Sequence, residues 1–400
     1  MSMNNAPSGE RLHIGIFGRR NAGKSSLINA LTGQSLAIVS DVKGTTTDPV
    51  IKAMELLPLG PVVVIDTPGL DDEGELGEKR IKKAYQMLNK TEIAILVVDG
   101  TVGMIAEDEA ILQRIVGKGL PYIIVFNHAD EMNEDQKLAC RESVAGHKMF
   151  FVSATTKQGI NELKEEIGKM LPSDDDKCMV RDLIMPSDLI ILVVPIDKAA
   201  PKGRLILPQQ MAIRDILDGN ATALVVKEDE LENTLATIGK KPFMVITDSQ
   251  VFELVDRITP KDIYLTSFSI LMARYRGDLE TTITGARALD KLKNGDTVLI
   301  AEACTHHRQC GDIGTQKLPN WINKHSGKKI NYEFCSGTEF PEDLSKYNLI
   351  VHCGACMINP KEMQFRLKCA VDAGVPITNS GIAIAHMHGI LDRSLQIFGL

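Results

Sequence analysis

Short apolar runs alternate with amphipathic segments along the first part of the chain. The runs with a strand pattern are 13–17, 62–66, 93–99, 122–127 and 148–154. Segments with helical spacing lie between them, for example at 24–33 and 109–119. Strands that alternate with helices are typical of a parallel sheet covered on both faces. The pattern therefore predicts an α/β domain over residues 8–172.

The same alternation recurs in two further regions, after a polar segment at 172–177 that we expect to be a linker. Helical spacing is found there at 207–219, and one long helical run covers 269–292. We expect three α/β domains in all, with a middle domain at 178–265 and a C-terminal domain at 266–400. Each is expected to contain a mostly parallel sheet with flanking helices. The apolar runs that predict strands in the last two domains are 189–195, 221–227, 242–248, 262–268, 296–303, 330–334, 349–353 and 375–379.

The composition is that of an ordinary globular protein, with 44% hydrophobic and 24% charged residues in a chain of 400. The 45 Lys and Arg residues against 52 Asp and Glu residues leave a net charge of −7, which disfavours a dedicated nucleic-acid-binding protein. No apolar run approaches the ~20 residues that span a bilayer. The first residues also lack the pattern of a secretory signal. We therefore expect a cytoplasmic protein that has neither nucleic acid nor a membrane as a partner.

A phosphate-binding motif lies between the first expected strand and the first expected helix. Residues 18–25 read GRRNAGKS and fit G-x-x-x-x-G-K-[ST] in the strand–loop–helix context that the motif requires. The glycines let backbone N–H groups surround the phosphates. Lys24 can reach the outer phosphates, and the Ser25 hydroxyl can hold Mg²⁺. The sequence therefore predicts a P-loop nucleotide site.

Further motifs follow in the order that GTPases use. Thr46 offers a hydroxyl to Mg²⁺ and the γ-phosphate, Asp66 places a carboxylate behind the magnesium, and Gly69 presents an N–H to the γ-phosphate. The carboxylate of Asp130 selects guanine, because adenine would leave it unpaired. We expect Lys24, Thr46 and Gly69 to be catalytic. The residues expected to contact the nucleotide are Gly18, Asn21, Ala22, Gly23, Lys24, Ser25, Ser26, Asp66, Gly69, Asn127, Asp130, Ser153 and Ala154.

This motif set resembles the small-GTPase family, in the branch that contains the tRNA-modification, Era and ribosome-assembly GTPases. The resemblance implies a P-loop GTPase fold in which Asn21 holds K⁺ beside the phosphates. Leu70 stands where other families place a water-orienting glutamine, so hydrolysis must recruit another group, for which Glu73 and Glu75 are candidates. His128 replaces the lysine that usually covers the base. We expect guanine specificity to be retained at weaker affinity.

Soft metal ligands are concentrated in the C-terminal region. Cys304 follows the expected strand 296–303, and Cys353 with Cys356 forms a C-x-x-C motif at the end of the strand 349–353. Because the carboxyl ends of parallel strands meet at one edge of a sheet, we expect the three thiolates to converge.

The spacing alone leaves a zinc site, an iron–sulfur cluster and free thiols open. His306 and His352 lie beside these cysteines and are candidate additional ligands. Cys310, Cys335 and Cys369 are expected to pack in the domain.

The GTPase motifs together with C-x-H-x45-H-C-x-x-C resemble the HydF family, the GTPases of [FeFe]-hydrogenase maturation. The resemblance implies a [4Fe–4S] cluster on Cys304, Cys353 and Cys356, with one iron that lacks a cysteine. It implies that a transient two-iron precursor carrying CO and cyanide is held there and delivered to apo-[FeFe]-hydrogenase. It also implies a homodimer formed through the middle domain, and two radical-SAM maturases as further partners.

We therefore expect a GTP-hydrolysing scaffold and carrier that uses Mg²⁺ and K⁺. The rival hypothesis is an RNA- or ribosome-linked assembly GTPase with a C-terminal zinc site, which the acidic charge disfavours. A redox enzyme is a third interpretation. The three clustered cysteines and the lack of a second cofactor motif disfavour it.

Overall fold

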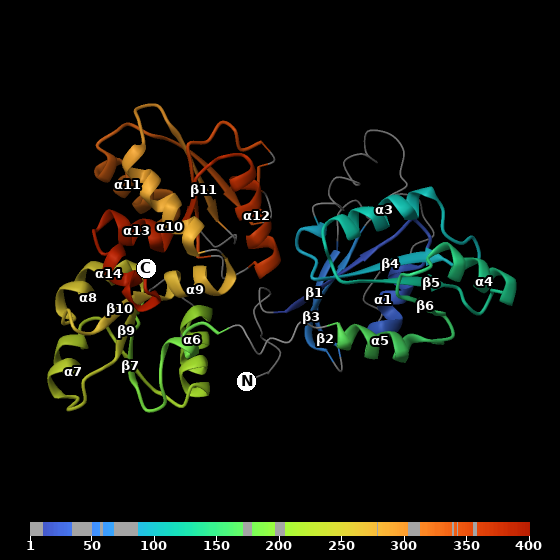
Figure 1. Cartoon of the computed structure of the whole chain (residues 1–400), viewed down its shortest axis with the longest axis horizontal. Coiled ribbons are helices and arrows are strands. Elements are labelled where there is room, and N and C mark those ends of the chain that lie inside the picture. The colour runs from blue at the N-terminus through green and yellow to red at the C-terminus, as the bar shows by residue number, and fades with distance from the viewer. Residues whose placement is uncertain are drawn as a thin grey trace. The chain divides into compact units, whose positions relative to one another are not determined.

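The computed structural model describes residues 11–33, 50–56, 59–67, 87–170, 178–196, 205–277, 279–302, 313–337, 340–341, 343–354 and 358–400. The chain divides into two compact units, Met1–Ser173 and Asp174–Leu400 (Figure 1). The first unit contains one sheet and the second contains two. All three sheets are mostly parallel and carry flanking helices, so the predicted α/β class is confirmed.

The sheet of the first unit has six strands in the order β2-β3-β1-β4-β5-β6. Its strands are β1 (Leu12–Phe17), β2 (Val50–Leu56), β3 (Gly60–Asp66), β4 (Ile93–Asp99), β5 (Tyr122–Asn127) and β6 (Met149–Phe151). One face packs on α1 (Lys24–Thr32) and α5 (Ile160–Lys169). The other packs on α3 (Ala106–Gly117) and α4 (Glu134–Ser143). The sheet is therefore covered on both faces, as the apolar strands predict.

Strand β2 was not expected from the sequence, and it runs antiparallel to β3. Val50 lies opposite Asp66, and Leu56 lies opposite Gly60. The connection between Leu56 and Gly60 is too short for the helical crossover that a parallel pair needs, so the two strands form a hairpin. Gly60 has a φ of +76°, which suits such a turn. The prediction of a parallel sheet holds for the other pairs of this sheet.

The second unit holds two four-stranded parallel sheets, in the orders β10-β9-β7-β8 and β12-β11-β13-β14. The strands of the first are β7 (Leu189–Val193), β8 (Thr222–Val226), β9 (Met244–Thr247) and β10 (Tyr264–Ser267). Those of the second are β11 (Thr297–Glu302), β12 (Asn331–Ser336), β13 (Leu349–His352) and β14 (Ile377–Asn379). The helices are α6 (Leu207–Asp218), α7 (Leu231–Thr237), α8 (Phe252–Ile258), α9 (Phe268–Arg276), α10 (Leu279–Arg287), α11 (Leu318–Ser326), α12 (Pro360–Asp372), α13 (Ser380–Met387) and α14 (Leu391–Leu395).

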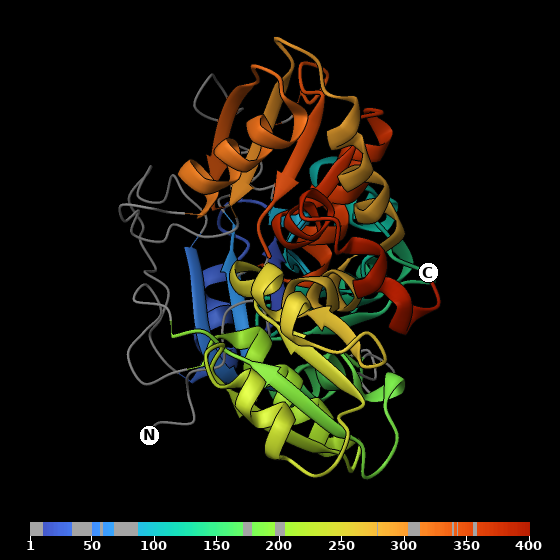
Figure 2. The same ribbon diagram turned by 90° about the vertical axis from the view of Figure 1, so that its left-hand side faces the viewer.

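Helices connect the two sheets of the second unit. Val245 of β9 belongs to one buried cluster with Ile283 of α10, Ile382 of α13 and Leu391 of α14. The opposite side of α13 packs on the other sheet, where Ala383 shares a buried cluster with β13. The labelled helices α10, α13 and α14 lie between the sheets in Figure 1, and Figure 2 shows the same layers from the side. The second unit is therefore one continuous packed body.

The helical run expected at 269–292 is helical for most of its length, but it is divided into separate helices. Helix α9 ends at Arg276, and α10 begins at Leu279. Gly277 between them has extended backbone, with φ −138° and ψ −162°. A Cβ atom at this position would come within 3.1 Å of the Leu367 side chain, so the glycine also permits close packing against α12.

The described helices include none that is long and apolar enough to cross a membrane. The domain boundaries expected at residues 172, 178 and 265 stay predictions.

Candidate functional site

The P-loop connects β1 to α1, and two of its glycines are required by the surrounding backbone. Gly18 has a φ of +143°, and a Cβ there would lie 2.2 Å from the carbonyl oxygen of Val97. Gly23 has a φ of +86°, and a Cβ there would lie 2.0 Å from Nδ2 of Asn127. Any other residue would push the loop away from β4 and β5. The loop is thus held tightly against the carboxyl ends of the central strands.

Lys24 lies inside this loop. Its side chain is buried, and Nζ donates to the carbonyl oxygens of Gly18 at 3.0 Å and Arg19 at 2.6 Å. The positive charge is therefore positioned among the backbone groups that surround a phosphate in P-loop proteins. Asn21 at the turn is exposed and has a φ of +60°. Its side chain is accessible to an ion at the loop surface.

The side chains of Ser25 and Asp66 meet between α1 and the end of β3. Ser25 Oγ donates to Asp66 Oδ2 at 3.0 Å. Burial raises the pKa of Asp66, against the opposing effects of Lys24, the Ser25 hydroxyl and Lys52. Hydroxyl and carboxylate oxygens are the ligands that Mg²⁺ prefers. The pair fits a magnesium site, whereas Thr46 and Gly69, the other residues expected at the γ-phosphate, lie outside the described residues.

Asn127 connects the P-loop to the segment expected to read the base. Its Nδ2 donates to the carbonyl oxygen of Ala22 at 3.2 Å, and its Oδ1 accepts from the Ala154 amide at 3.1 Å. Ser153 is buried, and its Oγ accepts from the Thr156 amide at 3.0 Å. The structure thus brings together Ala22, Asn127 and the 153–154 segment, which are all expected to contact the nucleotide.

The loop after β5 carries the remaining residues expected to recognise the base. Asp130 is exposed on this loop. His128 has a φ of +63°, and its Nδ1 lies 3.8 Å from Oε1 of Glu131. The ring is partly exposed, so it is accessible for stacking on a base, although it lacks the reach of a lysine.

A buried ion pair that the sequence analysis missed anchors the P-loop. Arg19 Nε donates to both carboxylate oxygens of Asp108, at 3.1 and 3.0 Å. Asp108 is fully buried in the first turn of α3. Burial raises its pKa, and the Arg19 charge opposes this shift. In the sequence Asp108 is one of several acidic residues at a helix start, which are usually solvated, so no local signal distinguishes it.

In the second unit, Cys353 follows the end of β13 and lies beside the end of β11. The Cys353 amide donates to the Ala301 carbonyl at 2.9 Å, and Ala301 is paired with His352. Cys304 follows β11 by two residues, so the chain brings the two cysteine-bearing strand ends to the same sheet edge. Cys304, His306, Cys310 and Cys356 themselves lie outside the described residues. Cys335 and Cys369 pack against the same buried cluster as Cys353.

His352 is fully buried, and both of its ring nitrogens are engaged. Nδ1 lies 2.9 Å from the Cys353 carbonyl oxygen, and Nε2 lies 3.0 Å from Nη1 of Arg366. Burial, reinforced by the Arg366 charge, lowers the pKa of His352 to about 3. The neutral ring therefore donates from Nδ1 and accepts at Nε2. In this arrangement Arg366 donates to the Nε2 lone pair of His352, which a metal ion would need for coordination.

Arg366 on α12 is a second buried charge that the sequence analysis missed. It is fully buried, and its guanidinium contacts Glu362 at 2.8 Å and the Gly337 carbonyl at 2.9 Å. It also lies 5.1 Å from the ring centre of Phe340. In the sequence, Glu362 and Arg366 have the i, i+4 spacing of an ordinary exposed helix pair. Only the tertiary structure shows that the pair faces His352.

Three family models match the chain. Residues 13–128 match "50S ribosome-binding GTPase", residues 179–277 match "Hydrogen maturase F dimerization domain", and residues 280–397 match "Hydrogen maturase F tetramerization domain". The division between the last two models falls at the break between α9 and α10.

Curated relatives match a smaller part of the chain. The tRNA modification GTPase MnmE of Chromobacterium violaceum is 38% identical over 163 residues, which cover 40% of this chain and 35% of that protein. GTPase Der of Kosmotoga olearia is 33% identical over 170 residues, which cover 40% of this chain and 38% of that protein. The chain thus spans little more than a third of the length of these relatives.

Among solved structures, Aquifex aeolicus Era bound to GDP.AlF4- aligns with a TM-score of 0.37 and 21% identity, covering 57% of this chain and 98% of that one. The GTPase model and the curated GTPases agree with the P-loop geometry, so the N-terminal unit is a GTPase domain. The two hydrogen maturase F models together match more than half of the chain. The chain therefore belongs to the hydrogen maturase F (HydF) family.

Proposed function

We propose that this protein is a GTP-hydrolysing scaffold of hydrogenase maturation. It binds a [4Fe–4S] cluster and carries a two-iron precursor with CO and cyanide to apo-[FeFe]-hydrogenase. The observation that carries the proposal is the 2.9 Å bond from the Cys353 amide to the Ala301 carbonyl. This bond supports a common site for Cys304, Cys353 and Cys356, in a chain whose second unit matches hydrogen maturase F.

The first unit supplies the GTPase. Lys24 stabilises the charge on the outer phosphates, and Ser25 with Thr46 holds Mg²⁺. Asn21 holds K⁺, and Gly69 presents its amide to the γ-phosphate. The contacts of Lys24 inside the loop and the Ser25–Asp66 bond support these roles. GTP binding and hydrolysis then act as a switch for partner association.

The second unit holds the cluster. Thiolates are the usual ligands of iron–sulfur clusters, and the three expected ones suit that group. They leave one iron with an exchangeable position, which is what a carrier needs for a second metal fragment. His352 holds the Cys353 backbone through its Nδ1 and is held by Arg366, so we assign it a positioning role rather than a ligand role. His306 remains a candidate ligand.

Self-association and delivery complete the proposal. The dimerization and tetramerization models match the middle and C-terminal regions, which supports assembly through the second unit. Apo-hydrogenase would receive the cargo, and the two radical-SAM maturases would supply it. A cytoplasmic location fits these partners. The match of the second unit to hydrogen maturase F disfavours the rival interpretation, an RNA- or ribosome-linked GTPase with a zinc site.

The test compares delivery by wild type, Cys353→Ala and Cys369→Ala. Each variant is purified anaerobically after coexpression with the two maturases and then mixed with apo-hydrogenase, and hydrogen evolution is measured. We expect activation by wild type and by Cys369→Ala, a matched control because Cys369 packs in the same cluster. Cys353→Ala should not activate. Equal activation by all three proteins would overturn the carrier assignment.

A further inference from the structure

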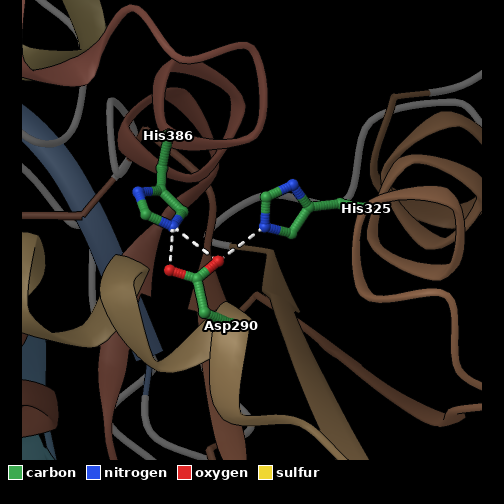
Figure 3. Close-up of side chains that lie close together, drawn as sticks. All are labelled: Asp290, His325 and His386. Carbon is green, nitrogen blue, oxygen red and sulfur yellow. Dashed lines mark hydrogen bonds and ion pairs between the residues drawn. The ribbon is translucent and has the colours of Figure 1, made fainter.

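Two histidines and an aspartate converge on the second unit, away from the cysteines. His325 Nε2 lies 2.7 Å from Asp290 Oδ1, and His386 Nε2 lies 3.0 Å from Asp290 Oδ2 (Figure 3). The two imidazole rings are 5.5 Å apart between centres and meet edge to face. One donor atom from each side chain lies within 4.8 Å of the other two, as in a site for one metal ion.

The three residues come from three elements that share one core. Asp290 lies in the short helix η5 (Ala288–Lys291), His325 in the last turn of α11, and His386 in the last turn of α13. Apolar residues of the same three elements, Leu289, Ile322, Ala383 and Ile384, are buried in a single cluster. Packing of these elements fixes the three donors before any ligand binds, which reduces the cost of binding.

This cluster is distinct from the cysteine site. Segment η5 precedes β11, and α11 leads into β12, so both lie near the amino ends of the strands. Helix α13 returns antiparallel to β14, which brings its last turn to the same end. Cys353 follows the carboxyl end of β13. The two sites are therefore at opposite ends of one sheet.

The Asp290 carboxylate lies between the two imidazole rings. Its Oδ1 lies 2.7 Å from Nε2 of His325 and 3.1 Å from Nε2 of His386. The histidine side chains are mostly covered, with 23% and 17% exposed, while the aspartate is 53% exposed. A cation would therefore have two anchored nitrogens, one anionic oxygen and an open side towards water.

We propose that Asp290, His325 and His386 bind Zn²⁺, with water as the fourth ligand. Imidazole nitrogen and carboxylate oxygen are donors that zinc accepts in sites with three protein ligands. Ligand atoms around a tetrahedral zinc with bonds of about 2.0–2.1 Å are about 3.3 Å apart, and the donor atoms of this cluster all lie within 4.8 Å of one another. The ion would clamp η5, α11 and α13 together.

The test uses the full-length protein and Zn²⁺ itself. Bound zinc is counted after competition with a chromophoric chelator, for wild type, Asp290→Asn, His325→Ala and His386→Ala. His388→Ala is the matched control, because His388 lies near His386 in the chain while its ring contacts Glu253 and Trp321 instead. Thiolates are also zinc ligands, so the measured quantity is the difference between variants. We expect wild type and His388→Ala to retain one more zinc per chain than the three cluster variants.

A second readout separates this site from the thiolates and from misfolding. Co²⁺ added to wild type should give visible ligand-field bands that are lost in His325→Ala, whereas the thiolate-to-cobalt charge-transfer bands should persist in that variant. Circular dichroism and the retained thiolate bands confirm that the variant is folded. Equal zinc content and equal cobalt spectra in wild type and the cluster variants would show that Asp290 only forms ion pairs with the two histidines, and would overturn the proposal.

Discussion

Arg366 Nη1 lies 3.0 Å from Nε2 of His352, and both side chains are completely buried. Through this contact Arg366 of α12 fixes the orientation of the His352 ring, which hydrogen-bonds to the backbone carbonyl of Cys353. Arg366 is in turn held by Glu362, so a charged pair in the core determines the orientation of a residue next to an expected cluster ligand. We expect the integrity of the cysteine site to depend on α12 as well as on the cysteines.

Replacing Arg366 by Ala should destabilise the second unit, because it leaves the Glu362 carboxylate and His352 Nε2 buried without their partner. The expected loss is about 3–5 kcal/mol in the free energy of unfolding, the usual cost of breaking a buried ion pair. Chemical denaturation followed by circular dichroism measures it. GTP hydrolysis by the first unit should be unchanged.

Arg287→Ala is the matched control for that variant. Arg287 is 62% exposed and lies 3.8 Å from Asp392, a geometry in which an ion pair contributes about 0–1 kcal/mol. A similar loss of stability in both variants would contradict the role of the Arg366 contacts. His352→Ala should retain iron but change the spectrum of the cluster, since we assign His352 to positioning.

The P-loop asparagine predicts a dependence on potassium. GTP turnover should be substantially faster in K⁺ than in Na⁺ at equal ionic strength, because Asn21 is expected to hold the ion beside the phosphates. Asn21→Ala should lose this response while it binds GTP with nearly unchanged affinity. Steady-state phosphate release in the two salts tests both points, and equal rates for the wild type would contradict the potassium assignment.

The two units should be separable in function. Lys24→Ala removes a main charge on the β- and γ-phosphates and should abolish GTP hydrolysis. The iron content after anaerobic reconstitution should stay at the wild-type level, because Cys304, Cys353 and Cys356 belong to the other unit. Loss of iron in this variant would show that the site and the GTPase are not independent.

The buried ion pair between Arg19 and Asp108 should support nucleotide binding, because it holds the P-loop against α3. Asp108→Ala leaves the Arg19 guanidinium without its partner and frees the loop from α3. Hydrogen bonds to charged groups contribute about 1.5–3 kcal/mol, so we expect GTP affinity to fall by about ten- to a hundredfold. Isothermal titration calorimetry measures the affinity. Glu107→Ala, an exposed change in the same helical turn, should bind GTP like wild type, and a comparable loss there would argue against the pair.

The strands and the P-loop could be predicted because each has a local signal. Apolar runs bounded by turns predicted β4, β7 and β13. The P-loop motif requires glycine at positions 18 and 23, where the structure leaves no space for a Cβ atom. The antiparallel strand β2 was missed because no apolar run marks it in the sequence. The short connection to β3 determines its pairing. The close approach of Gly277 to Leu367 joins residues far apart in the chain, so no local signal marks it.

The roles of the buried charged residues could not be predicted, because they also depend on contacts between distant parts of the chain. Asp108 and Arg366 have the spacing of solvated helix residues, and only packing shows that they face Arg19 and His352. The Asp290 cluster gathers residues from three separate elements, so no motif connects them in the sequence. Tertiary contacts, not local propensity, distinguish these residues from their neighbours.

The most direct test of the central claim is an EPR spectrum of the reduced, anaerobically reconstituted protein, recorded with and without added cyanide and accompanied by iron and zinc counts. We expect about four irons per chain and a cubane-type signal that shifts when cyanide is added, because one iron lacks a cysteine ligand. Cys353→Ala should lose both the iron and the signal, whereas Cys335→Ala should keep them. Zinc in place of iron at the cysteines, or an iron signal that ignores cyanide, would contradict a carrier with an open cluster site.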